Sequence, residues 1–100
     1  CRFTELTSLD VSNNTALTEL HCGFNQLTSL DISNNSSLNW LGCEANQLTS
    51  LNLRNGNNTN MSPIATGNNQ LYCIEVDDAT WSTANWTNID PQHYFSEDCP

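Results

Sequence analysis

One stretch of the sequence recurs at a fixed interval, and this recurrence limits the fold more than any other feature of the chain. Residues 27–48 read LTSLDISNNSSLNWLGCEANQL and residues 6–27 read LTSLDVSNNTALTELHCGFNQL, with leucine, cysteine and asparagine at matching places. The same register continues at 48–53 with LTSLNL. A period of about 20 to 29 residues is typical of chains that stack one structural unit on the next.

Each period contains two shorter units of one form. Residues 27–37 and residues 38–47 both follow the pattern L-x-x-L-x-hydrophobic-x-x-N. Hydrophobic residues two positions apart, such as Leu30 and Ile32, share one face of a β-strand. Each period therefore predicts two short strands on opposite sides of a flattened coil. Successive coils would stack these strands into two parallel sheets, with the leucines between them.

The pattern continues after residue 53 with an insertion of two residues. The polar segment 55–60, NGNNTN, is a turn sequence that can absorb the added length. The inward and turn positions of the next units are then expected at Met61, Ile64, Thr66, Asn69, Leu71, Ile74 and Val76. The stack would hold about 3.5 coils, close to the minimum of about three that repeat architectures need for stability.

The repeat pattern ends after Val76. Asp77 and Asp78 can cap a short helical turn over 79–86, because carboxylates accept hydrogen bonds from the free N–H groups at a helix start. The tail also gathers aromatic residues, namely Trp81, Trp86, Tyr94 and Phe95. A stack of repeats needs a terminal segment that covers its last apolar surface. The sequence thus predicts a solenoid over 1–76 and a C-terminal cap over 77–100.

The repeat resembles the leucine-rich-repeat family, and within it the bacterial variant with nested ten- and eleven-residue half-repeats. The resemblance extends over roughly residues 1–76, where several hydrophobic columns and an asparagine column recur together. It implies a mainly β, right-handed solenoid with a small irregular or short-helical cap. The tail from residue 73, CIEVDDATWSTANWTNIDPQHYFSEDCP, also resembles the terminal cap of secreted bacterial repeat proteins. This second resemblance implies an extracellular or cell-surface location.

Composition argues against two classes of partner. Eleven Asp and Glu stand against two Arg and no Lys, for a net charge of −9. Nucleic acid is not expected as a partner, because phosphate recognition needs clustered cations. Membrane insertion is not expected either, because no apolar run approaches the about 18 residues of a membrane span.

The cysteines fall into two groups. Cys1, Cys22 and Cys43 recur at the interval of the repeat, in the inward position of the second strand, where a free thiol acts as a small buried apolar group and an inter-coil bond is the alternative. No His or carboxylate shares this column and no Cys-x-x-Cys occurs, so no metal is expected.

Cys73 aligns with an outward serine column. In the secreted setting that the tail implies, an exposed lone thiol is not expected, and Cys99 is the only unassigned partner, so we predict a Cys73–Cys99 disulfide. Because Cys1 already falls in the repeat register, we also expect the sequence to be a segment of a longer protein.

Asparagine follows each predicted strand. These amides are expected to bond backbone groups in the tight turns and to stack as ladders, at Asn14, Asn25, Asn35, Asn46 and Asn69. Six asparagines also begin Asn-x-Ser/Thr sequences, a small excess over what the composition gives by chance. They are candidate glycosylation acceptors: Asn13, Asn34, Asn35, Asn57, Asn60 and Asn85.

No enzyme signature is present in the sequence. The two histidines, His21 and His93, have no Ser or Cys near them in a recognisable nucleophile setting. The carboxylate pairs 77–78 and 97–98 are explained more simply as caps or solvated charge. We therefore expect no catalytic residue, no cofactor and no metal.

Two outward surfaces remain as candidate binding sites. Trp40 beside Phe24 and His21 is the best patch by residue type, although Trp40 could instead pack on a neighbouring coil or on another domain. On the other sheet, Asp10 and Asp31 would begin a column continued by Asn52 and Glu75, and stacked like charges repel. Arg54, diagonal to this column, is expected to relieve it; solvent screening, a basic partner surface or a bound Ca²⁺ are the alternatives.

The expected function is non-catalytic binding or adhesion by an extracellular bacterial protein, with a protein or glycan ligand, as the family resemblance implies. A structural alternative is a subunit or spacer in an extracellular fibre, in which copies of the chain pack end to end. A third hypothesis, ice binding, depends on the flat threonine column Thr7, Thr28 and Thr49. The acidic column beside it counts against that hypothesis.

Overall fold

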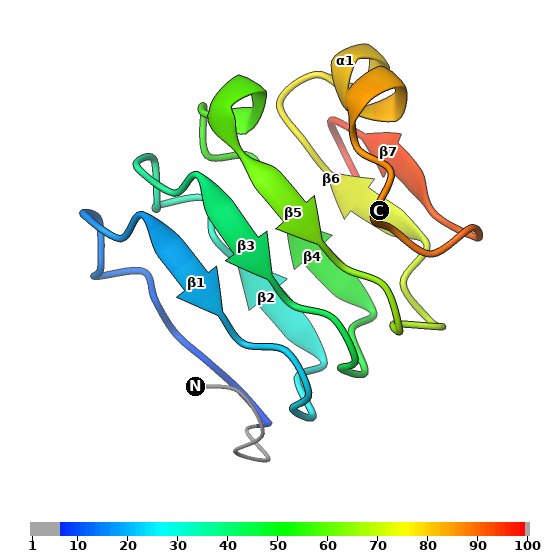
Figure 1. Ribbon diagram of the computed structural model, residues 1–100, viewed down its shortest axis with the longest axis horizontal. Helices are drawn as coiled ribbons and strands as arrows, with labels where there is room; N and C mark the ends of the chain where they lie inside the picture. The colour runs from blue at the N-terminus through cyan, green and yellow to red at the C-terminus, as the bar shows by residue number, and fades with distance from the viewer. Residues whose placement is uncertain (1–6, 100) are drawn as a thin grey trace.

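The computed structural model describes residues 7–99 and consists mainly of short parallel strands in two sheets (Figure 1). The three-stranded sheet contains β1 (Glu19–His21), β3 (Trp40–Gly42) and β5 (Ser62–Ile64). The four-stranded sheet contains β2 (Ser29–Asp31), β4 (Ser50–Asn52), β6 (Cys73–Glu75) and β7 (Tyr94–Ser96). A 3₁₀ turn, η1 (Asn58–Asn60), precedes β5, and one helix, α1 (Ala79–Asn85), follows β6.

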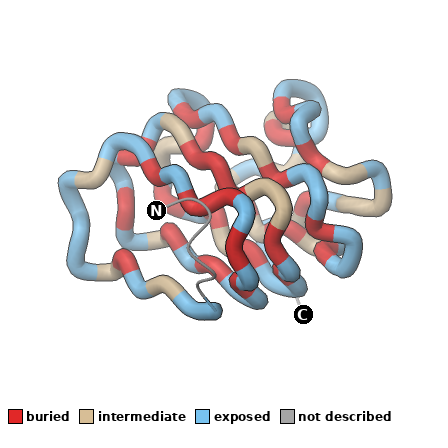
Figure 2. Tube along the Cα trace, turned by 60° about the horizontal axis from the view of Figure 1, so that its bottom comes forward, coloured by how far each residue is buried: buried red, intermediate tan, exposed pale blue. Residues whose placement is uncertain are grey.

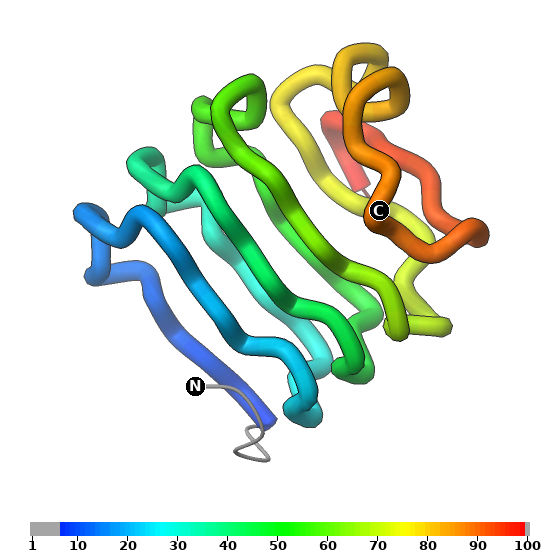
Figure 3. The backbone as a smooth tube through the Cα atoms, in the orientation of Figure 1, coloured from blue at the N-terminus to red at the C-terminus, as the bar shows by residue number. Residues whose placement is uncertain are grey.

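The chain passes alternately through the two sheets, so each strand up to β6 pairs with the strand of the same sheet one pass away (Figure 3). Leu20 pairs with Leu41 in one sheet and Leu30 with Leu51 in the other, and both pairs are separated by one period of the sequence repeat. The predicted parallel strands on two sides are confirmed, and the arrangement is compatible with a small solenoid.

The core lies between the sheets and is made by the central residue of each strand together with the hydrophobic residues that flank it. Buried segments recur on every pass, while most turn segments are exposed (Figure 2). The inward positions that the sequence predicts are buried, namely Leu30, Ile32, Leu41, Cys43, Leu51 and Leu53. Ser29 and Asp31, on either side of Leu30 in β2, face solvent as the strand period of two requires, and Thr28, just before the strand, is exposed as well.

Asparagine amides join adjacent passes of the chain through their backbones. Asn46 donates from Nδ2 to the carbonyls of Cys22, at 3.0 Å, and Cys43, at 3.1 Å, and accepts at Oδ1 from the N–H of Leu27. On the opposite side, Asn35 donates to the carbonyl of Val11. These bonds satisfy backbone groups that would otherwise be buried without partners, so asparagine is structural at these positions.

β5 pairs with β3 one residue earlier than the repeat pattern predicts. Pro63 pairs with Leu41, so Pro63 and Ala65 face inward and Ile64 and Thr66 do not. The ladder position is likewise taken by Asn68 and not by Asn69; Asn68 is buried and donates to the carbonyls of Cys43 and Ala65.

The register differs because the inward positions are more closely spaced in this unit. η1 takes up the inserted residues, but a single residue separates buried Met61 from Pro63, where two separate Leu38 from Leu41. Proline is tolerated at this place. The N–H of Ser62 points toward β3, where it bonds the Asn39 carbonyl, so the nitrogen of the next residue points toward the outer edge of the sheet and no ladder bond is lost.

The C-terminal segment contains the predicted helix and one strand that was not predicted. Asp78 caps α1, because its Oδ1 accepts from the N–H groups of Thr80 and Trp81. Trp86 is buried and its Nε1 donates to the carbonyl of Met61 at 3.1 Å. β7 adds a fourth strand beside β6, with Phe95 opposite Ile74.

Candidate binding site

A hollow of about 360 Å³ lies over the outward face of β2, β4 and β6, and we call it the sheet hollow. Short polar side chains from two neighbouring strands, among them Ser29, Asp31, Ser50 and Asn52, form much of its lining. Hydroxyl, amide and carboxylate groups on paired strands therefore lie side by side on the sheet surface. Such an array can exchange hydrogen bonds with an extended ligand laid across the strands.

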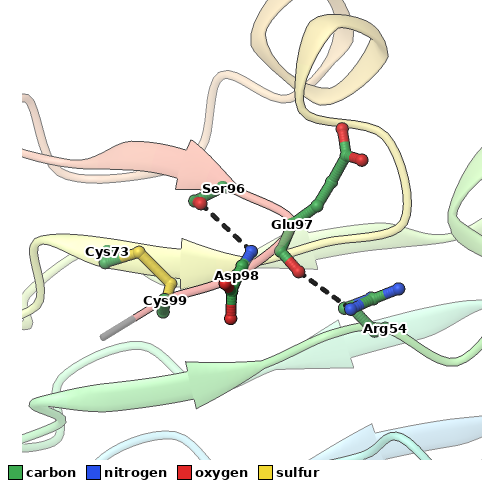
Figure 4. Close-up of a disulfide and its surroundings, with 6 residues drawn as sticks. All are labelled: Arg54, Cys73, Ser96, Glu97, Asp98 and Cys99. Atoms are coloured by element: carbon green, nitrogen blue, oxygen red, sulfur yellow. Dashed lines mark hydrogen bonds between the residues drawn. A yellow bond between two sulfur atoms is a disulfide. The ribbon is translucent and has the colours of Figure 1, made fainter.

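The C-terminal tail borders the sheet hollow through Cys99, and Figure 4 shows the bonds that hold this tail. The predicted disulfide between Cys73 and Cys99 is present, with 5.9 Å between the two Cα atoms, and Cys99 lines the hollow. Arg54 holds the same tail, since its Nη1 donates to the carbonyl of Glu97 at 2.8 Å. A covalent bond and a charge-assisted hydrogen bond thus fix the tail against β6 and the end of β4.

The predicted acidic column is only partly assembled as a row. Asp31 pairs with Asn52, and Asn52 pairs with Glu75, so these three side chains follow one another across the sheet. Asp10 is exposed but belongs to no strand and does not line the sheet hollow. Its carboxylate accepts from the Ser12 hydroxyl and, at 2.9 Å, from the N–H of Ser12, and these hydrogen bonds lower the pKa of Asp10.

Two side chains of the column accept hydrogen bonds from the backbone of their own segment. Asp31 Oδ1 accepts from the N–H of Ser33 at 2.8 Å, and Asn52 Oδ1 accepts from the N–H of Arg54 at 3.0 Å. Within residues 7–99 the Arg54 guanidinium forms no ion pair with Asp31 or Glu75. The guanidinium instead donates to the Glu97 carbonyl of the folded tail, and relief of the column by the nearby charge of Arg54 stays a prediction.

The aromatic residues of the other candidate patch lie on the outward side of the three-stranded sheet. The His21 and Trp40 rings stack with 4.3 Å between centroids, and His21 Nε2 lies 3.2 Å from Glu19 Oε1. The indole also lies close over Gly42, where a Cβ would come within 2.8 Å of it. Trp40 is thus half-buried against its own strand and against β1. Phe24 follows at the next turn, 42% exposed and with φ at +58°.

A second hollow, of about 450 Å³, lies where η1 meets the start of the C-terminal segment, and we call it the cap hollow. Its lining includes Arg54, Thr59, Asp77, Asp78 and Trp81. Sequence reasoning missed it, because the residues come from segments that meet only when the tail folds back. The one available signal was the Asp77–Asp78 pair, which was interpreted as a helix cap.

The candidate glycosylation sites differ in accessibility. Asn35 is fully buried and its Nδ2 donates to backbone carbonyls, so a glycosyltransferase could not reach it in the folded chain. The Nδ2 groups of Asn57, Asn60 and Asn85 are engaged in hydrogen bonds. Asn13 and Asn34 are exposed at corresponding turns.

The two described free thiols are structural by position. Cys22 and Cys43 are buried, as predicted, whereas Cys1 lies outside the described residues. Burial, reinforced by the charge of Glu44, raises the pKa of the Cys22 thiol to about 11, and burial raises the pKa of Cys43 as well. Both thiols are therefore protonated at neutral pH and poor nucleophiles.

Residues 7–99 contain no group of three or more His, Cys, Asp or Glu side chains placed to hold a metal ion. Across the same residues, no helix has both the length and the apolar character that crossing a membrane requires.

Comparisons of the chain with models of protein families, with curated proteins and with solved structures found no match.

Proposed function

We propose that this chain is a non-catalytic binding module of the leucine-rich-repeat type, from a secreted or surface-exposed bacterial protein. The leucines that pair one sequence period apart and the asparagine amides that join successive passes support the family assignment. The Cys73–Cys99 disulfide supports an oxidising compartment, since such bonds do not persist in most cytosolic proteins.

The sheet hollow is the observation on which the proposed binding role depends. Its floor of short polar side chains leaves backbone-like hydrogen-bonding groups accessible, and the tail that borders it is held covalently. Rigid sites bind with a smaller entropy cost than flexible ones, because less conformational freedom is lost.

The partner that fits the sheet hollow is a protein segment with basic side chains. Asp31 and Glu75 lie in its lining, and the chain carries a net charge of −9. Arg54 forms no ion pair with these carboxylates, and its guanidinium donates to the Glu97 carbonyl. An extended segment bearing Lys or Arg would bring the missing charge and bond the polar floor through its backbone.

Selection from a display library of short random peptides tests this proposal. We expect the retained peptides to be rich in Lys and Arg and to bind more weakly as salt is added. Ser50→Trp, which fills the sheet hollow, should abolish their binding. The matched control is Ser62→Trp, which places the same side chain on the outward face of the other sheet and should bind normally. Peptides without basic residues, or peptides that bind Ser50→Trp as well as the parent, would overturn the proposal.

A further inference from the structure

The cap hollow differs in chemistry from the sheet hollow. Its lining combines the aromatic residue Trp81 with the cationic Arg54, the hydroxyl-bearing Thr59 and two aspartates. Its volume of about 450 Å³ lies within the range of about 300–1,000 Å³ typical of small-ligand sites. A ligand that fills it must present an apolar face and several hydrogen-bonding groups together.

The polar groups of the cap hollow are held in place by backbone bonds. Asp77 accepts from the N–H of Gly56 at Oδ1, at 3.2 Å, and from the N–H of Asn58 at Oδ2, at 3.3 Å. Asp78 uses Oδ1 to cap α1, and Arg54 is held through the Glu97 carbonyl. Carboxylate oxygens can accept more than one hydrogen bond, so both aspartates retain capacity for a ligand hydroxyl in a fixed direction.

The Trp81 ring is fixed as well. It packs edge to face with Trp86 at 5.7 Å between centroids, and Trp86 is itself buried against the Met61 carbonyl. An aromatic ring that is immobile before binding offers apolar contact without a further loss of side-chain freedom.

The charges of the cap hollow select among ligand classes. The lining contains two aspartates and a single arginine, and Glu97 lies close by, since its Oε2 accepts from the N–H of Ala79. An anionic ligand would meet net repulsion there. A cationic ligand would be attracted by the carboxylates but could not use the guanidinium of Arg54. A neutral polyol can use both kinds of charged group, since it donates to the carboxylates and accepts from the guanidinium.

We propose that the cap hollow binds a neutral pyranose residue, as a single sugar or at the end of a glycan. The C–H face of the ring would lie against Trp81, and its hydroxyls would donate to Asp77 and Asp78 and accept from Arg54 and Thr59. This site is separate from the sheet hollow, and it takes a saccharide where the sheet hollow takes a peptide segment.

Titration with four methyl pyranosides, those of glucose, mannose, galactose and N-acetylglucosamine, tests this proposal. Binding is followed by the indole N–H signals of the three tryptophans in NMR spectra of the whole chain. We expect at least one pyranoside to bind with a dissociation constant in the range of about 1–10 mM, and to shift the Trp81 signal while the Trp40 signal stays in place.

Two variants locate the bound sugar. Thr59→Trp fills the cap hollow from an exposed position and should weaken binding by at least about tenfold. Ser36→Trp is its matched control, because Ser36 is exposed two residues before buried Leu38, as Thr59 is before buried Met61. Asp78→Asn, which retains a helix cap but loses the charge, should weaken binding by about three- to tenfold.

Three results would overturn the proposal. The first is no binding of any of the four pyranosides up to about 50 mM, which is weaker than any useful sugar site. The second is binding that shifts Trp40 and survives Thr59→Trp. The third is a lysine-rich peptide that shifts Trp81 when no pyranoside does, which would assign the hollow to a basic segment.

Discussion

The stacked passes of the chain and its C-terminal segment use different side chains to hydrogen-bond similar backbone N–H and C=O groups. Between passes a single residue type both donates and accepts. Asn68 accepts at Oδ1 from the N–H groups of Asn46 and Leu48 and donates from Nδ2 to the carbonyl of Cys43. An amide carries both donors and acceptors, so the same residue can serve again one pass later.

In the C-terminal segment the two tasks are divided between residues. Asp90 accepts from the N–H of Gly67 at 2.9 Å and from the N–H of Asn68. The amide of Gln92 donates to the carbonyls of Asn68 and Leu71. A carboxylate has no hydrogen to donate, so aspartate ends a ladder that asparagine propagates. The repeated region thus depends on interchangeable contacts, whereas the cap depends on contacts that occur once.

The largest expected effect belongs to the shared core of the repeated region. Leu41→Ala should lower the free energy of unfolding by about 2–5 kcal/mol, because Leu41 is fully buried and the cavity cannot be filled from a stack this thin. Urea denaturation followed by circular dichroism measures the change. Ile64→Ala, at a half-exposed outward position on β5, is the control and should cost far less. Equal losses for the two variants would contradict the inward assignment of Leu41.

The next effect distinguishes the C-terminal segment from the stacked strands. Cys99→Ser should lower the free energy of unfolding by about 2–4 kcal/mol, since the disulfide closes a loop with a sequence separation of 26. Hydrogen exchange should accelerate mainly in β7 and the tail, while β2 and β4 keep their protection. Uniform acceleration over the whole chain would show that the two regions unfold as one unit, and the comparison between them would fail.

Exchanging asparagine and aspartate at positions 68 and 90 tests whether an amide and a carboxylate are interchangeable at these two positions. Asn68→Asp should cost about 2–3 kcal/mol, because it removes two buried amide donations and buries a charge. Burial raises the pKa of the new carboxyl, so the variant should be most stable at low pH and should lose stability as the pH rises through the ordinary Asp range.

Asp90→Asn is the partner in this exchange and should cost only about 1 kcal/mol, since one amide oxygen can still accept from the Gly67 or the Asn68 N–H. Thermal denaturation at several pH values compares the two variants. Equal losses, or a loss for Asn68→Asp that does not depend on pH, would show that the two ladder positions are equivalent after all.

The smallest expected effect is a gain in stability. Ala45 has φ at +55°, in the left-handed region, while Gly67 takes φ at +77° one pass later. Ala45→Gly should therefore change the free energy of unfolding by no more than about 1 kcal/mol, in the stabilising direction. Ala16→Gly, at an exposed turn residue without positive φ, should be neutral or destabilising. A clear loss for Ala45→Gly in thermal denaturation would show that its methyl group is needed more than the relaxed backbone.

The repeat carried most of the information that could be read from the sequence. The leucines and isoleucines that recur in every period identify the inward positions, because the strand period of two leaves no other side for them. The disulfide could be found because Cys73 breaks an outward serine column. These features are local or periodic, and sequence alone reports such features well.

The features that were missed depend on contacts between distant segments. The shift that brings Pro63 inward follows from how η1 fits against the preceding pass, and counting from Met61 cannot show it. β7 pairs with β6 only after the tail folds back around α1. The cap hollow and the Arg54–Glu97 bond have the same origin, since residue 54 and residue 97 are neighbours only in the folded chain.

The inward proline of β5 has a consequence for growth of the stack. A strand that added beside β5 would find no hydrogen at the Pro63 nitrogen, and the next outward donor, the N–H of Ala65, is already taken by the Asn88 carbonyl. The three-stranded sheet therefore ends at β5 partly because the backbone donors on its outer edge are missing or occupied, and not only because the C-terminal segment covers it. On this side two donors that a further strand would use are missing or occupied, and this disfavours pairing with a foreign strand at this edge.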